Sequence, residues 1–301
     1  MKKHTGMLVA FLTPALIFFV LIFVYPIIRT ALMSLHKVEN VTAAYASWEF
    51  VGLDNFKTLI KTQLFQDSMW NIFRIWAIGG IVVMGLALLF AVFLNSGIRF
   101  KKFFRAVIYM PNIISAVALA TMWQQYVFNT KFGLLTGFFK TIGWETMAKI
   151  QWTSPENLFW ALLFAYCFGM VGYHMLIFSS GIEKIPQDFY EASTLDGATK
   201  PKQFFYITLP LLKGVFKTNI TMWSITSAGF FIWSQLFSSV NVSRQVITPM
   251  VYMYMQAFGG SMVVTERFYG VASAVGVLLA LIVVAIFTIT NLLIKDDELE
   301  F

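Results

Sequence analysis

Six long apolar stretches dominate this sequence, and each could cross a lipid bilayer as a helix, which takes about 20 residues. They cover approximately Met7–Ile28, Ile75–Leu94, Ala106–Phe128, Leu158–Ile182, Val215–Val240 and Phe268–Ile294. All 15 acidic residues lie outside these limits. The chain is 12% charged, against about 25% in soluble domains. The sequence therefore predicts an all-α integral membrane protein with six transmembrane helices, forming one domain over residues 1–301.

The first apolar stretch follows Lys2 and Lys3, as the core of a secretory signal would. Its apolar run is longer than the roughly 7–15 residues of a signal core. No small-x-small cleavage site follows Tyr25-Pro26. We therefore expect an uncleaved first helix rather than a signal peptide.

Basic residues predict the orientation of the helices, because Lys and Arg concentrate in cytoplasmic loops. The connection between the second and third stretches carries Arg99, Lys101, Lys102 and Arg105 without an acidic residue. The connection that begins at Asn129 has a smaller basic excess, which favours the opposite orientation. The denser cluster outweighs it, so we expect both termini in the cytoplasm. The same Lys and Arg residues in cytoplasmic loops account for the net charge of +7. We do not expect nucleic-acid binding, because the sequence shows no basic stripe interleaved with exposed aromatic residues.

Several kinds of chemistry are excluded by what the sequence lacks. A Walker A loop needs Gly-Lys before Ser or Thr, and the chain has no Gly-Lys dipeptide. Ion-coupled carriers often place ionisable groups inside the membrane, whereas His174 is the one such imidazole here, and we interpret it as a packing residue. Cys167 is the single cysteine, so disulfides within the chain are excluded. We expect no catalysis, metal or cofactor on this chain, and an energy source on another chain.

The cytoplasmic stretch 183–212, between the fourth and fifth apolar stretches, predicts two short helices. Pro186 and Asp188 suit the start of the first helix, and Gly197 can take the left-handed conformation that ends it. Pro201 suits the start of the second helix, and Pro210 leads into the fifth stretch.

Phe189, Ala192 and Leu195 recur at helical spacing in the first of these helices, beside Glu191. One interpretation is an amphipathic linker that lies on the membrane surface. The other is a docking helix for a cytoplasmic partner. The apolar stripe fits both, so the residues alone leave the two open.

Glu191-Ala192-Ser193, Gly197 and Ile207-x-Leu209-Pro210 resemble the EAA motif of permease subunits from binding-protein-dependent ABC importers. Three residues separate Ser193 from Gly197 and nine separate Gly197 from Ile207, and the motif lies in a cytoplasmic loop as it should. Ser193 stands where the second Ala of the motif is usual. The resemblance implies that this helix sits in a cleft of an ATP-hydrolysing subunit. The implied coupling residues are Glu191, Ala192, Ser193, Gly197, Leu209 and Pro210.

The resemblance extends over nearly the whole chain and points to the carbohydrate branch typified by the maltose-transporter permeases. The matching segments are Pro14-Ala-Leu-Ile-Phe with Tyr25-Pro26-Ile-Ile, Phe50-Val-Gly52-Leu-Asp54-Asn55-Phe56, Phe104 to Pro111 with Ser115 and Trp123, Tyr252 to Phe258, and Gly270 to Ala274. One departure is Ser238–Arg244, where many sugar permeases carry Gly-Gly-Pro near the surface that meets the binding protein.

This resemblance implies an assembly in a bacterial inner membrane, with partners that supply what the chain lacks. An extracytoplasmic solute-binding protein would deliver the ligand, and two ATPase subunits would hold ATP and Mg²⁺. A second, similar permease chain would complete the pore. The resemblance favours a different chain over an identical copy.

Neutral polar residues on the fifth stretch are candidates for the substrate path, because hydrogen-bonding groups suit polyhydroxylated sugars. Two aromatic residues on other stretches could stack on sugar faces. These candidates are Asn219, Thr221, Ser224, Thr226, Ser227 and Gln235, with Trp123 and Tyr173. Hydrogen bonding between helices is at least as good an explanation of each.

Three other functions stay open. A phosphate-bearing solute such as glycerol phosphate, or a polyol, would suit the same machine, and Arg29, Arg74 and Lys217 at the edges of the apolar stretches could meet a phosphate. An ion-coupled secondary carrier is disfavoured by the lack of acidic residues in the apolar stretches. A structural scaffold is disfavoured by the EAA-like loop.

Overall fold

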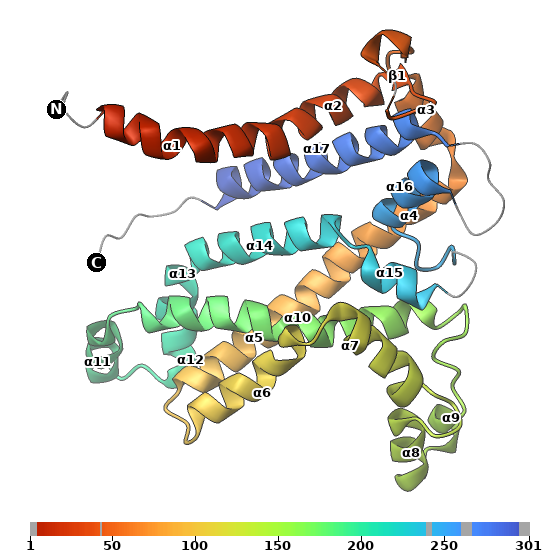
Figure 1. Cartoon of the computed structure of the whole chain (residues 1–301). Coiled ribbons are helices and arrows are strands. Elements are labelled where there is room, and N and C mark those ends of the chain that lie inside the picture. Colours follow the sequence, from red (N-terminus) through yellow and green to blue (C-terminus); the bar gives the residue numbers. More distant parts are fainter. Residues whose placement is uncertain (1–4, 43, 239–242, 260–266, 295–301) are drawn as a thin grey trace. The chain divides into compact units, whose positions relative to one another are not determined.

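A computed structural model describes residues 5–42, 44–238, 243–259 and 267–294 (Figure 1). Its contacts divide the chain into two compact units. The first contains residues up to Gln66 together with Tyr252–Leu281, and the second contains Asp67–Val251 and the residues from Ile282 on.

The first unit opens with one continuous helix and continues into a small hairpin and a short helix. Its elements are α1 (Thr5–Phe19), a π-helical turn (Val20–Val24), α2 (Tyr25–Ser34), β1 (His36–Lys37), a 3₁₀ turn (Tyr45–Ser47), β2 (Glu49–Phe50) and α3 (Asp54–Lys61). The strands are antiparallel, with His36 opposite Phe50 and Lys37 opposite Glu49. Most of α16 (Pro249–Phe258) and the first half of α17 (Tyr269–Leu293) also belong to this unit.

Asn55 holds the first unit together at the end of α2. Its side-chain amide donates to the carbonyl oxygens of Ser34 at 2.8 Å and His36 at 3.0 Å. Gly270, at the start of α17, lies against the same spot: a Cβ there would lie 2.2 Å from the His36 carbonyl oxygen and 2.8 Å from the Asn55 amide nitrogen. Two motif segments far apart in sequence therefore meet at one packing site.

The second unit is a bundle of helices. Its elements are α4 (Gln63–Arg74, begun in the first unit), a π-helical turn (Ile75–Gly79), α5 (Gly80–Asn95), α6 (Lys101–Ile113), α7 (Ala116–Met122), a π-helical turn (Trp123–Val127), α8 (Leu134–Thr141), α9 (Glu145–Ala148), α10 (Leu158–Glu183), α11 (Gln187–Leu195), α12 (Lys200–Gln203), a π-helical turn (Phe204–Thr208), α13 (Leu209–Leu211), α14 (Lys213–Ala228) and α15 (Ile232–Phe237).

Helix α10 is the centre of this bundle and packs along α5, α6 and α14 (Figure 1). In the most apolar 18-residue segment of α10, two thirds of the residues are buried. In the corresponding segment of the first helix, none is buried. Gly172 permits the close approach of α6, because a Cβ there would lie 2.4 Å from the Ile108 carbonyl oxygen. At the other end of α10, a Cβ on Gly181 would lie 2.5 Å from a side-chain carbon of Val215 and 3.0 Å from one of Leu212.

Within the described residues, four continuous helices are long and apolar enough to cross a membrane: Val9–Ser34, Gln63–Asn95, Leu158–Glu183 and Tyr269–Leu293. They contain four of the predicted stretches almost completely. The second helix begins at Gln63, well before the predicted Ile75, because the amphipathic helix α4 continues directly into the apolar part.

The prediction of one continuous helix over Ala106–Phe128 is wrong. The chain bends by 96° between Lys101–Ile113 and Ala116–Val127. Pro111 removes one backbone donor near the end of α6, and Ile114 is extended with a ψ of 136°. Ser115 then caps α7, its hydroxyl accepting from the Ala118 amide at 3.3 Å.

The prediction of one helix over Val215–Val240 is also wrong. Helix α14 ends at Ala228, and α15 begins only at Ile232; positions 239–242 lie outside the described residues. The break is stabilised because Thr248 donates to the Phe230 carbonyl oxygen at 2.5 Å and the Phe230 side chain is buried. Gly229 lies at the break itself, but the hydroxyl of Thr248, which completes it, lies 18 residues from Phe230.

Candidate functional site

The loop between α10 and α14 folds as two short helices, as predicted. Helix α11 begins after Pro186 and carries Asp188 in its first turn. Gly197 ends it with a φ of +75°, a conformation that glycine reaches without strain. The Gly197 amide donates to the Thr194 carbonyl oxygen at 3.0 Å, and the Ala198 amide to that of Ser193 at 2.9 Å, so the last turn of α11 is closed on itself.

The inner face of α11 is tied to the helical segment 200–211 by side chains. Gln203 is buried, and its amide nitrogen lies 3.1 Å from the Tyr190 carbonyl oxygen, 2.9 Å from the Ser193 hydroxyl and 2.9 Å from the Thr194 hydroxyl. The hydroxyls of Tyr190 and Thr208 lie 2.8 Å apart. These contacts make the two short helices one rigid piece.

The outer face of α11 carries the apolar stripe and is exposed. Leu195 is 90% exposed and Phe189 is 43% exposed, and Glu191 and Ala192 are exposed beside them. None of the residues of α11 is buried in this chain. Because large apolar side chains at helical spacing face outward together, the helix presents a ready contact surface.

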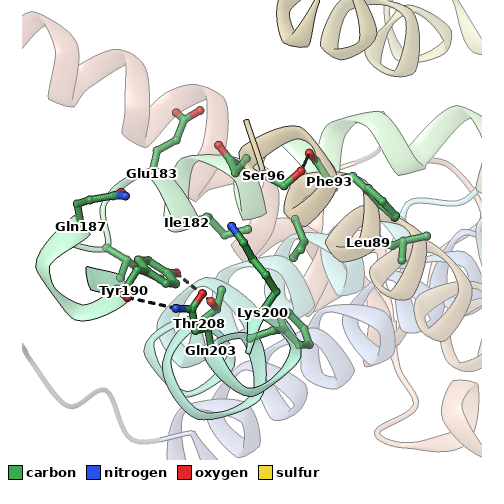
Figure 2. Close-up of a pocket in the computed structure, with 14 residues that line it drawn as sticks. Leu89, Phe93, Ser96, Ile182, Glu183, Gln187, Tyr190, Lys200, Gln203 and Thr208 are labelled. Atoms are coloured by element: carbon green, nitrogen blue, oxygen red, sulfur yellow. Dashed lines mark hydrogen bonds between the residues drawn. The ribbon is translucent and has the colours of Figure 1, made fainter. Parts of the chain in front are cut away.

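A cavity of about 580 Å³ separates this loop from the ends of α5 and α10 (Figure 2). Phe93 lines it from α5 and Ser96 from the position directly after that helix, Glu183 from α10, and Tyr190 and Gln203 from the loop. Close packing resists small displacements. The cavity therefore leaves the loop freer to shift against α5 than a filled interface would.

Of the remaining predicted coupling residues, Leu209 is half-buried and Pro210 is exposed in α13. Directly after them, Leu212 is fully buried against a cluster that includes Met175, Phe178 and Ala91. The far end of the loop is therefore anchored in the bundle, while α11 faces outward.

Half of the candidate path residues are buried between helices. Asn219 lies 2.7 Å from the ring nitrogen Nδ1 of His174, which is fully buried. The Ser224 hydroxyl accepts from the indole of Trp76 at 2.9 Å. Ser227 and Trp123 are buried as well. The packing interpretation of His174 agrees with this placement, and Asn219 and Ser224 make the interhelical hydrogen bonds that the alternative explanation expects.

The other four candidates remain accessible. Thr226 and Gln235 are exposed, and Thr221 and Tyr173 are half-buried. The hydroxyls of Thr221 and Thr226 donate to carbonyl oxygens of their own helix, at 2.9 Å to Lys217 and at 3.0 Å to Met222. Their oxygens can still accept a hydrogen bond from a solute.

The basic residues considered for a phosphate are engaged elsewhere. Arg29 donates to the Val41 carbonyl oxygen and to the Tyr25 hydroxyl. Arg74 donates to Asn71 and lies 3.9 Å from the centre of the Phe159 ring. The departure at Ser238–Arg244 lies largely outside the described residues, but Arg244 itself pairs with Asp67 at 3.2 Å.

The sequence interpretation missed Gln203, Thr208 and Tyr190, which join the two short helices. Gln203 directly precedes the apolar run Phe204–Ile207, and nothing else in the local sequence marks it, because its partners lie on another helix.

The sequence is similar to those of known transport proteins. Residues 83–295 match the model of the family described as binding-protein-dependent transport system inner membrane component. The chain is 27% identical to the arabinooligosaccharides transport system permease protein AraP of Bacillus subtilis, over 93% of this chain and 86% of that protein. It is 28% identical to the sn-glycerol-3-phosphate transport system permease protein UgpA of Shigella flexneri, over 67% and 66%.

The fold is similar to that of a chain in the crystal structure of a bacterial ABC transporter involved in the import of the acidic polysaccharide alginate. The TM-score is 0.81 at 19% identity, covering 98% of this chain and 97% of the other. The family model covers more than two thirds of the sequence and includes the whole candidate loop. The chain therefore belongs to the family of binding-protein-dependent transport system inner membrane components.

Proposed function

We propose that this chain is the permease subunit of an ATP-driven importer for a sugar or oligosaccharide. The observation that carries the proposal is helix α11, whose inner face is fixed to the chain and whose apolar outer face is exposed beside the EAA-like residues. Membership of the family favours the docking helix over a membrane-surface linker. The names of relatives such as the arabinooligosaccharide permease support the sugar class.

The proposed machine works by alternating access. A solute-binding protein delivers the sugar at the outer face, and two partner ATPase subunits hold ATP and Mg²⁺. Their closure pushes on α11 through the exposed Glu191 and Ala192. Ser193 fastens the helix from its inner face, and Gly197, Leu209 and Pro210 shape the loop behind it. A second, similar permease chain completes the pore.

In this proposal, residues 1–301 form one transmembrane domain with six membrane crossings and both termini in the cytoplasm. The bent pair α6–α7 and the broken pair α14–α15 supply the third and fifth crossings. Broken helices are tolerated in a membrane where they line a cavity or pack against protein.

The accessible residues Thr221, Thr226, Gln235 and Tyr173 are the proposed lining of the sugar path. The buried residues Asn219, Ser224, Ser227 and Trp123 position that lining by holding α14 and α7 in the bundle. Glycerol phosphate is the second candidate solute, because a glycerol-phosphate permease is among the relatives. The engagement of Arg29 and Arg74 within the chain favours the neutral sugar.

The test is to purify the chain with candidate ATPases and binding proteins and to measure ATP hydrolysis and uptake into vesicles. The solute panel contains arabinooligosaccharides, diacetylchitobiose, alginate oligosaccharides, glycerol and sn-glycerol 3-phosphate. We expect a sugar-loaded binding protein to stimulate hydrolysis and uptake. Uptake that needs an ion gradient but no ATP would contradict the proposal.

A paired variant isolates the role of the loop. Gly197→Pro removes an amide that donates at 3.0 Å and cannot reach a φ of +75°. Gly143→Pro makes the same change at the end of α8, where Gly143 has a φ of +77° and donates to Lys140 at 3.2 Å. We expect Gly197→Pro to abolish stimulated hydrolysis and Gly143→Pro to retain ATPase binding. Equal behaviour of the two variants would refute the coupling role of the loop.

A further inference from the structure

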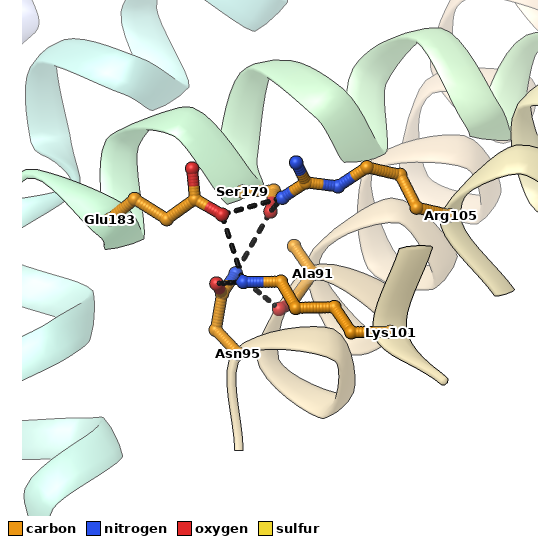
Figure 3. A network of polar contacts seen from close by, with 6 residues as sticks. All are labelled: Ala91, Asn95, Lys101, Arg105, Ser179 and Glu183. Carbon is orange, nitrogen blue, oxygen red and sulfur yellow. Dashed lines mark hydrogen bonds and ion pairs between the residues drawn. The ribbon is translucent and has the colours of Figure 1, made fainter. Parts of the chain in front are cut away.

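Five polar side chains meet at the end of α10, and the proposed function above assigns none of them a role (Figure 3). They are Asn95, Lys101, Arg105, Ser179 and Glu183, called here the Glu183 cluster. One carboxylate oxygen of Glu183 accepts from the Lys101 ammonium at 2.9 Å and from the Arg105 guanidinium at 2.6 Å. Two cations therefore converge on a single oxygen.

The remaining contacts close the cluster into a network. Arg105 also donates to the Ser179 hydroxyl at 2.7 Å, and Lys101 donates to the side-chain amide oxygen Oδ1 of Asn95 at 2.6 Å. The Asn95 amide donates to the Ser179 hydroxyl at 2.9 Å and to the Ala91 carbonyl oxygen at 2.9 Å. Each of the five members contacts two others, so the cluster forms a closed ring of polar contacts.

The cluster joins the ends of three helices just before the coupling loop. Asn95 ends α5, Lys101 and Arg105 lie in the first two turns of α6, and Glu183 ends α10. Pro186 follows three residues after Glu183, and α11 begins directly after it. Glu183 and Asn95 also line the cavity beneath the loop.

Topology alone does not require this arrangement. A basic cytoplasmic loop orients a membrane protein through its charge, whatever its side chains contact. Lys102, beside Lys101, supplies the same charge with an exposed side chain. Lys101 and Arg105 instead converge on the last residue of α10, so their positions serve a second purpose.

Stability is a weak explanation as well. The side chains of Lys101, Arg105 and Glu183 are 34–44% exposed, and ion pairs of that exposure contribute little to folding. Glu183 is the last residue of α10. The contact fixes the positions of the helix ends more than it stabilises the fold.

We propose that the Glu183 cluster carries the motion of the coupling loop sideways into α5 and α6. The inference rests on the proposed coupling function and adds a route to it. Covalent connection passes a push on α11 only to α10 and α14, and the packing of α10 adds apolar contacts with α5 and α6. The cluster makes α5 and α6 follow the end of α10, so that the second and third membrane crossings move with the fourth. Glu183, Lys101 and Arg105 are positioning residues in this scheme.

Amide hydrogen exchange in the assembled complex tests the route without any transported solute. The complex of this chain with its ATPase subunits is compared with and without a non-hydrolysable ATP analogue. In the wild type we expect the analogue to change exchange in both 187–211 and 95–105. In Glu183→Gln, which keeps the shape and removes the charge, we expect the change in 187–211 to remain and that in 95–105 to disappear.

Uptake per ATP hydrolysed gives a second readout, which a general loss of folded complex would leave unchanged. The probe is the compound of the panel above that shows the greatest uptake. We expect Glu183→Gln to lower this ratio by about 2- to 30-fold and Glu183→Asp to restore part of it. The double variant with Arg105→Gln and Glu183→Gln should lower this ratio no further than the more impaired of the two single variants, because both substitutions remove the same contact. Lys102→Gln, an exposed neighbour, should match the wild type.

The outcomes separate this inference from the proposed function. No nucleotide response in 187–211 of the wild type would overturn the coupling function itself. A response in 187–211 without one in 95–105, or an unchanged ratio in Glu183→Gln, would overturn the cluster alone. Equal losses in Glu183→Gln and Lys102→Gln would mean that the contact of Glu183 has no special role, and would also overturn the proposal.

Discussion

At the scale of single residues, Ser193 shows how a departure from a motif can be used by the fold. The EAA-like pattern would place Ala there, and a small side chain satisfies the pattern in either case. The structure adds that the Ser193 hydroxyl donates to the Tyr190 carbonyl oxygen and accepts from Gln203. The serine thus helps to fasten α11 to the segment behind it.

We predict that Ser193→Ala loosens α11 without changing its docking face. Loss of one hydrogen bond to a buried amide should lower the local opening free energy by about 0.5–1.5 kcal/mol. Amide hydrogen exchange of residues 187–197 measures this quantity. Thr218→Ala is the control, because that exposed hydroxyl donates only within its own helix, to Gly214 at 3.0 Å. Unchanged exchange in Ser193→Ala would mean that Tyr190 and Thr194 hold Gln203 without it.

At the scale of the elements, the membrane helices divide into those that are packed and those that are largely exposed. Helix α10 buries most of its residues, and the close contact of α6 requires Gly172 at the crossing. Asn112 supports the same crossing by donating to the Gly169 carbonyl oxygen at 3.3 Å. The bend after Pro111 follows directly, so the crossing and the bend form one structural unit.

We predict that Gly172→Ala destabilises this crossing by about 1–3 kcal/mol, because the added methyl meets backbone atoms that cannot rotate away. Gly85→Ala is the matched control: Gly85 lies in α5 with nothing within 4 Å of a Cβ, so alanine should be neutral or slightly stabilising. Thermal denaturation of the purified chain in detergent compares the two. A Gly172→Ala variant as stable as Gly85→Ala would refute the contact.

At the scale of the whole molecule, the proposed orientation explains where the functional surfaces lie. The basic connection at Arg99–Arg105 and the coupling loop share the cytoplasmic side, as the Glu183 cluster requires. The α8–α9 segment, which carries Lys140, belongs to the opposite side in this scheme.

We predict that cysteines on the two sides react from opposite faces of the membrane. Lys102→Cys should react with an impermeant maleimide only in inverted vesicles, and Lys140→Cys only in intact spheroplasts. Both side chains are exposed. Cys167, the only cysteine in the sequence, is buried and provides a low background. Labelling of both positions from one side would contradict the proposed topology.

The sequence by itself determined the class of protein, four of the helices nearly to the residue at one or both ends, and the two helices of the coupling loop. Those features follow from local rules: apolar length, proline at helix starts and glycine at a left-handed helix end. The tertiary structure decided where the third and fifth predicted helices break, since Thr248 and the crossing at Gly172 act from other segments. It also decided which polar residues of α14 are buried, and that Lys101 and Arg105 converge on Glu183. The pairing of Lys101 with Glu183 joins residues 82 positions apart, and that of Trp76 with Ser224 joins residues 148 apart. No local pattern encodes such pairings.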